Sequence, residues 1–145
     1  MDEKKIIEKF GIYFDEIGLN KTYGRIFGLF MISQKPLSMS EVIEALQISK
    51  STASNELRRL LMMGYLEKVS FSGERSDFYQ LVENVWQVHF HKKMEIIDKL
   101  SSIIELVPVK ERKKFKNLKN MSEYCAFMQN KLSMLIQEFT LTYPH

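Results

Sequence analysis

Small and apolar residues recur every three or four positions between residues 49 and 64, and this spacing predicts a helix. The face that packs consists of Ala53, Leu57, Leu60 and Leu61. Ser49 is a suitable N-cap because its hydroxyl can accept a hydrogen bond from a backbone N–H two or three residues on. Gly64 is a suitable end because glycine adopts the left-handed conformation at little cost. We therefore expect one helix over residues 49–63.

The opposite face of this helix carries small hydroxyls, an amide and cations. Hydroxyls and backbone N–H groups can bind phosphate oxygens, whereas Asn and Arg side chains can read base edges in the major groove. An ordinary solvated polar face would have a similar composition. The candidate DNA-contacting residues on this helix are Ser49, Lys50, Ser51, Thr52, Ser54, Asn55, Arg58 and Arg59.

Residues 36–46 predict another helix immediately before it. Ser38 and Glu41 have the three-residue spacing of a capping box, and an apolar face follows at Val42, Ile43 and Leu46. Only Gln47 and Ile48 separate the two helices. Two helices joined by so tight a turn indicate a helix-turn-helix.

Two strand-like runs follow, over residues 65–71 and 77–81, with a turn-like segment at residues 72–76 between them. Together they predict a β-hairpin. Arg75 would lie near its tip, where a cation can enter a minor groove or contact a phosphate. A helix-turn-helix followed by such a hairpin is a winged helix, a mainly α fold with a small β-hairpin wing (α+β).

Residues 19–81 resemble the winged-helix core of the MarR superfamily, and in particular its GbsR-like branch. The resemblance implies a DNA-binding transcription factor that is typically a dimer, and some relatives control genes for osmoprotectant uptake or synthesis. Residues that carry the resemblance are Tyr23 to Phe30, Pro36, Leu37, Ser38, Glu41, Leu46, Ser49, Lys50, Ser51, Ser54, Leu57, Leu60, Gly64, Gly73, Glu74 and Arg75.

The flanking segments predict amphipathic helices over residues 4–17, 20–33 and 83–107, and a long apolar seam over residues 115–139. Asn20 is a suitable N-cap for the second of these helices. They carry more apolar surface than a winged-helix core can cover. We therefore expect one domain, residues 1–145, in which residues 1–18 and 82–145 form a homodimer. A monomer whose helices fold back on the core is the alternative. Two recognition helices related by a two-fold axis would read half-sites about 10 bp apart.

Close helix packing is predicted at Gly24 and Gly28, whose four-residue spacing lets a neighbouring helix approach. The apolar stripes are expected to be core residues. In the first helix these are Ile6, Ile7, Phe10, Phe14 and Ile17, and in the second they are Tyr23, Ile26, Phe27, Phe30 and Met31. In the C-terminal segments they include Trp86, Ile96, Ile103, Phe115 and Leu135.

Composition adds little that is specific. The 145 residues carry a formal net charge of +3, which mildly favours an anionic partner. The single cysteine excludes an intramolecular disulfide and fits a reducing cytoplasm. No segment resembles a secretory signal, and no apolar run approaches the roughly 18 residues of a membrane span. We expect a cytoplasmic protein with no membrane partner.

Catalytic chemistry has no support in the sequence. Nucleophile-elbow, phosphate-loop and zinc-protease motifs are missing, so we expect no enzyme activity, cofactor or metal. His89 and His91 would point to nearly opposite sides of a helix and could not easily share a metal; the third histidine is His145. Cys125 lies on the last apolar seam without a cationic neighbour and is expected to act as a small hydrophobe.

Two features leave alternatives open. The aromatic residues Tyr13, Phe14, Tyr23, Phe27, Trp86 and Phe90 could form a cage for a quaternary ammonium effector, but at helical spacing they are more often core. The basic run at residues 110–119 could contact DNA flanks, anionic partners or only water.

The function that best fits is sequence-specific DNA binding by a transcriptional regulator. A winged-helix module that binds protein is the alternative. The three arginines Arg58, Arg59 and Arg75 favour DNA, because a protein-binding face would not need them.

Overall fold

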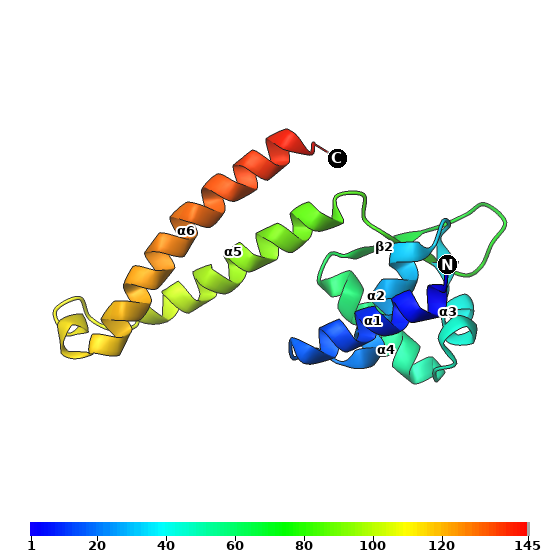
Figure 1. The fold of residues 1–145 in the computed structure, drawn as a ribbon, viewed down its shortest axis with the longest axis horizontal. Helices are drawn as coiled ribbons and strands as arrows, with labels where there is room; N and C mark the ends of the chain where they lie inside the picture. Colours follow the sequence, from blue (N-terminus) through cyan, green and yellow to red (C-terminus); the bar gives the residue numbers. More distant parts are fainter. Residues whose placement is uncertain (145) are drawn as a thin grey trace. The chain divides into compact units, whose positions relative to one another are not determined.

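The computed structural model describes residues 1–144. These divide into two compact units, Met1–Glu83 and the chain from Asn84 onward (Figure 1). In the described chain, no helix is both long and apolar enough to cross a membrane.

The first unit is a winged helix, which confirms the predicted mainly α fold with a small sheet. It contains four helices and three short strands in the order α1 (Glu3–Glu16), α2 (Lys21–Ile32), β1 (Leu37–Ser38), α3 (Met39–Leu46), α4 (Lys50–Met62), β2 (Leu66–Val69) and β3 (Phe78–Leu81). The helix-turn-helix is α3 and α4, and β2 and β3 form the wing. Predicted and observed helix bounds differ by at most three residues.

Side-chain capping fixes where each helix of this unit begins. The N-caps are Asp2, Asn20, Ser38 and Ser49, and each accepts a hydrogen bond from a backbone N–H three residues on. Between α3 and α4, Gln47 adopts a left-handed backbone with φ of 54°. This single residue turns the chain tightly enough to join the two helices of the motif.

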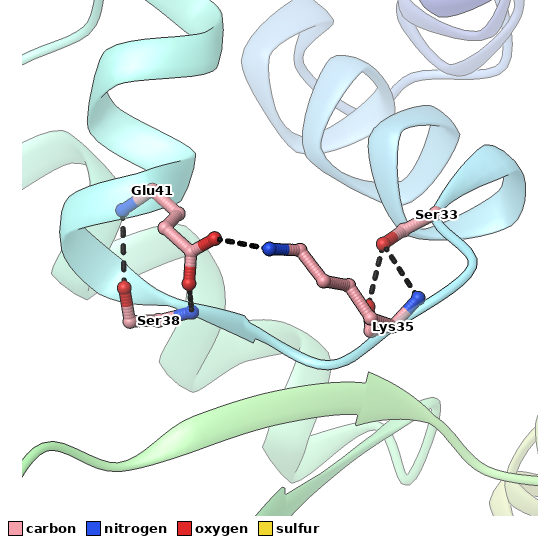
Figure 2. Close-up of polar contacts among 4 residues, drawn as sticks. All are labelled: Ser33, Lys35, Ser38 and Glu41. Carbon is pink, nitrogen blue, oxygen red and sulfur yellow. Dashed lines mark hydrogen bonds and ion pairs between the residues drawn. The ribbon is translucent and has the colours of Figure 1, made fainter. Parts of the chain in front are cut away.

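A network around the start of α3 confirms the predicted capping box (Figure 2). The Glu41 backbone N–H donates to Ser38 Oγ at 3.2 Å, and the Ser38 backbone N–H donates to Glu41 Oε1 at 3.1 Å. Lys35 Nζ lies 3.3 Å from Glu41 Oε2. Ser33 in turn donates to the Lys35 carbonyl. The hydrogen bond from the Ser38 backbone, helped by Lys35, holds the pKa of the Glu41 carboxyl below its usual range.

The sheet has the order β1-β3-β2, and both pairings are antiparallel. The sequence did not predict β1. It has only two residues, too few to show alternation, and it exists because Leu37 and Ser38 pair with Tyr79 and Phe78 of β3. This pairing attaches the start of the helix-turn-helix to the wing.

Helices α1 and α2 pack very closely through the two glycines, as predicted. A Cβ atom at Gly24 would lie 2.5 Å from the Phe10 carbonyl oxygen, and one at Gly28 would lie 2.9 Å from Phe10 Cβ. Helix α1 is therefore part of the winged-helix unit.

One residue of the predicted apolar stripe of α1 is not in the core. Ile17 follows the end of the helix and is 54% exposed.

The core of the first unit gathers residues from all four helices and from the wing. Met31, which was expected in it, is only half-buried. The buried set includes Ile7, Phe14, Tyr23, Ile26, Phe27, Phe30, Val42, Leu46, Ala53, Leu57, Leu60, Tyr65, Leu66 and Tyr79.

The second unit is a hairpin of two long helices that lie side by side (Figure 1). They are α5 (Val85–Ile104) and α6 (Lys116–Thr142), and a 3₁₀ turn, η1 (Arg112–Lys114), lies between them. Ile97, Cys125 and Leu132 form the buried core, covered by Phe90, Met94, Leu100, Met121 and Met128. The burial of Cys125 fits its expected role as a small hydrophobe.

The apolar stripes of this hairpin are wider than its core. Expected core residues that are exposed in the structure are Trp86, Ile96, Ile103, Phe115 and Leu135. Two helices can bury only the surfaces that face each other, so the rest of each stripe remains in solvent.

Candidate nucleic-acid interface

Helix α4 has one buried face and one polar face, as the sequence predicts. Ala53, Leu57 and Leu60 are almost completely buried, at 0–1% exposure. The exposed candidate residues on the helix are Lys50, Ser51, Asn55, Arg58 and Arg59, while Thr52 and Ser54 are half-buried. Because the buried residues fix the rotation of α4, the polar side chains must point to solvent.

A cluster of three hydroxyls marks the N-terminus of α4. Ser49 Oγ accepts from the Thr52 backbone N–H at 3.1 Å and donates to Thr52 Oγ1 at 2.8 Å. Ser51 Oγ lies 3.3 Å from Ser49 Oγ. The Ser49 hydroxyl is thus used mainly to cap the helix. Ser51 is exposed at an end of the helix whose free N–H groups and positive dipole suit an anion.

Asn55 and Arg58 are the two α4 side chains best placed to bind a partner. Both are exposed, and neither makes a hydrogen bond or ion pair within residues 1–144. They are three positions apart on a helix and therefore lie on the same side of it. Their amide and guanidinium groups can each form two hydrogen bonds to a base edge.

Arg59 has a different environment from Arg58. Its Nη1 donates to Glu56 Oε2 at 2.9 Å, and its guanidinium lies 5.0 Å from the centroid of the Tyr23 ring. Asn20 Nδ2 donates to the other Glu56 oxygen at 2.9 Å. Asn20 Oδ1 accepts from the Tyr23 backbone N–H at 2.7 Å, which closes a ring of contacts between α4 and the start of α2.

This ring holds α4 against α2. Burial raises the pKa of Tyr23 to about 12, with further increases from Tyr65 and Glu56 and an opposing effect from Arg59. Tyr23 is therefore neutral at physiological pH. Sequence reasoning predicted Asn20 as a cap but missed its contact with Glu56, 36 positions away, because the sequence does not show how α2 and α4 are placed together.

The wing is held by contacts across the hairpin. Lys68 Nζ lies 3.6 Å from Asp77 Oδ2, and the rings of Phe71 and Phe78 meet at 5.1 Å. At the tip, Gly73 has a φ of 85°, a left-handed conformation that suits a turn. Asp77 is thus engaged by Lys68, and within the described residues Arg75 is exposed and makes no ion pair.

Comparison with known proteins identifies a helix-turn-helix in the same part of the chain. Residues 24–70 match the family profile of the IclR helix-turn-helix domain. The chain is 29% identical to a putative HTH-type transcriptional regulator of Bacillus subtilis, YvaV, over 94% of this chain and 86% of that protein. It is 32% identical to the HTH-type transcriptional repressor OpcR of the same organism, over 59% of this chain and 46% of that protein.

A crystal structure of a transcriptional regulator has the same fold, with a TM-score of 0.82, 21% identity, and coverage of 97% of this chain and 99% of that one. The chain is a winged-helix transcriptional regulator. The predicted resemblance to winged-helix regulators, and the expectation that the protein is not an enzyme, are confirmed at this level.

Metal-binding chemistry is not evident in the described part of this regulator, where no three His, Cys, Asp or Glu residues come together. Of the three histidines in the sequence, His145 lies outside the described residues. Burial, followed by the charge of Lys93, lowers the pKa of His89.

The six aromatic residues proposed as an effector cage are divided between the two units. Phe14, Tyr23 and Phe27 meet in the core of the first unit. In the second, Trp86, His89, Phe90, Lys93 and Phe139 line a pocket of about 340 Å³. The lining of this pocket is almost entirely apolar.

Proposed function

We propose that this regulator binds double-stranded DNA sequence-specifically as a homodimer. The recognition helix, residues 49–63, would enter the major groove, and the wing, residues 72–76, would contact the minor groove or the backbone. The observation that carries the proposal is the exposed pair Asn55 and Arg58, which has no partner within residues 1–144 and lies on a helix whose opposite face is locked into the core.

The other site residues have supporting roles in this proposal. Lys50, Ser51, Thr52 and Ser54 lie along the first turns of α4 and would hold phosphates, together with Arg75 on the wing. Ser49 caps the helix. Arg59 lies at the margin, where a backbone contact would compete with its contacts to Glu56 and Tyr23.

The exposed apolar surface of the helical hairpin supports dimerisation. Ile96 is 66% exposed, Phe127 61% and Met134 56%, although they lie within regular helices. The N-terminal segment exposes apolar residues of its own, Ile12 and Tyr13 on α1 and Ile17 just after it. A second copy of the chain is the simplest cover for such surface.

Membership of the GbsR-like branch is part of the same proposal and rests on the residues quoted for the resemblance.

In vitro selection from a random duplex library tests the proposal. The purified full chain should enrich a two-fold symmetric site with half-sites about 10 bp apart. A library in which no sequence is enriched, with retention depending only on salt, would contradict sequence-specific recognition. The protein-interaction alternative would then be preferred.

A further inference from the structure

The turn that joins α5 to α6 is the most concentrated basic segment of the chain. Among residues 110–119 the only acid is Glu111. Arg112 is half-buried, and its Nε donates to the Val107 carbonyl at 2.9 Å, so it supports the turn. The remaining cations are all exposed lysines, at positions Lys110, Lys113, Lys114, Lys116 and Lys119. Within the described chain only the last of them has an acidic neighbour, Glu123 at 3.9 Å.

The same turn exposes large apolar side chains. Leu106 is 82% exposed, Val109 72% and Phe115 49%. Such exposure is unfavourable in water, at roughly 25 cal/mol for each Å² of apolar surface. An ordinary solvated lysine segment would not need these side chains.

Backbone hydrogen bonds give this turn a defined shape. The Glu111 and Arg112 N–H groups both donate to the Pro108 carbonyl, at 2.8 and 3.2 Å. The Phe115 N–H donates to the Arg112 carbonyl at 3.2 Å, which leads into α6. The lysines and the apolar side chains are therefore presented together by one ordered turn.

The chemistry of a partner follows from this combination. A DNA backbone would pair with the lysines but gain nothing from the apolar side chains. The same turn of a second copy would bring like charges together. An anionic bilayer satisfies both groups, because apolar side chains enter the headgroup boundary while lysine ammonium groups reach the lipid phosphates.

We propose that this turn, residues 105–119, is a peripheral docking site for an anionic phospholipid surface. The sequence predicts no membrane partner because it has no spanning segment, but a surface contact requires none. The site lies entirely in the second unit, so it does not depend on the proposed DNA-binding function.

Co-flotation of the full chain with vesicles tests this assignment. Mixed phosphatidylcholine–phosphatidylglycerol vesicles should bind the protein, and phosphatidylcholine vesicles should not. Replacing Lys110, Lys113, Lys114 and Lys116 by Gln should lower the partition coefficient more than about a hundredfold, since each lysine near the surface contributes about fivefold. A matched control that replaces Lys4, Lys5, Lys9 and Lys21 by Gln loses the same charge and should still bind.

The apolar contribution is tested separately. Leu106→Ser with Val109→Ser keeps every lysine and should weaken binding about tenfold, whereas Leu141→Ser, at a position 78% exposed on α6, should not. Circular dichroism melting curves verify that each variant is folded. Equal binding by the turn variants and the parent chain, or equal binding to both kinds of vesicle, would overturn the proposal. Two other results would also overturn it. One is a Leu106→Ser, Val109→Ser variant that is monomeric while the parent chain is dimeric. The other is a loss of DNA affinity in the variant that lacks the turn lysines but not in the control that lacks Lys4, Lys5, Lys9 and Lys21.

Discussion

Arg59 lies over the ring of Tyr23, with its guanidinium carbon 5.0 Å from the ring centroid, and pairs with Glu56 at 2.9 Å. Within the described residues, the neighbouring Arg58 has neither contact. Two adjacent arginines of α4 therefore have different physical tasks: one fixes the helix and the other is available to a partner.

Substituting the two arginines should separate these tasks. We expect Arg59→Gln to lower the free energy of unfolding by about 1 kcal/mol, because it removes a cation–π contact and a partly exposed ion pair. The dependence of DNA affinity on salt should not change. Arg58→Gln should leave stability unchanged. Urea unfolding and binding titrations at several salt concentrations measure both effects. A reduced salt slope for Arg59→Gln with unchanged stability would instead indicate a phosphate contact.

The stability of α3 should depend on the charge of Glu41. Its pKa is lowered in the folded protein from an ordinary value of 4.5, so the ionised carboxylate stabilises the fold above that value. This stabilisation should be lost as pH falls through the lower, folded-state pKa. Glu41→Gln should cost about 0.3–1 kcal/mol at pH 7, and the difference from the parent chain should disappear below the folded-state pKa.

Chemical denaturation at neutral and acidic pH measures this difference. Glu44→Gln is a suitable control, because Glu44 is exposed on the same helix and its carboxylate makes no ion pair among the described residues. A gap between the parent chain and Glu41→Gln that persists unchanged in acid would exclude the carboxylate as its source.

Local signals account for the parts of this fold that the sequence predicts. The caps Asn20, Ser38 and Ser49 and the packed face of α4 depend on neighbours within four positions, so spacing alone reveals them. The strand β1 and the bridge from Asn20 to Glu56 depend on tertiary placement. The exposure of Ile96 and Leu135 has the same cause, since an apolar stripe does not specify how much of its width a neighbour covers.

Dimerisation should depend on the exposed apolar surface of the hairpin. We expect the parent chain to be a dimer, and Phe127→Glu with Met134→Glu to be monomeric and folded, because both side chains are more than half exposed in the single chain. Light scattering at micromolar concentration measures the mass. A parent mass near 17.1 kDa would contradict the dimer. Deleting residues 1–17 is a poor test, since α1 packs on α2 and its loss would disrupt the winged helix itself.

The wing should contribute affinity more than specificity. Arg75 is exposed near a turn and makes no ion pair in the described chain, so we expect it to contact phosphate. Arg75→Ala should reduce affinity for all sequences by a similar factor and lower the salt slope by about one for each subunit. Lys68→Ala, which removes the ion pair with Asp77, is a control for loss of wing order. An unchanged salt slope for Arg75→Ala would mean that Arg75 does not touch the backbone.

The central claim is that the exposed face of α4 reads DNA sequence, and binding by Asn55→Ala and Arg58→Ala to the selected site tests it most directly. Each variant should lose about 1–3 kcal/mol of binding free energy and relax the preference at one defined base pair, because a bidentate contact to a base edge is lost. Leu57→Ala should also abolish binding, but through unfolding, so melting curves must accompany every titration. If both polar variants remain folded and keep full affinity and selectivity, α4 is not the reading helix.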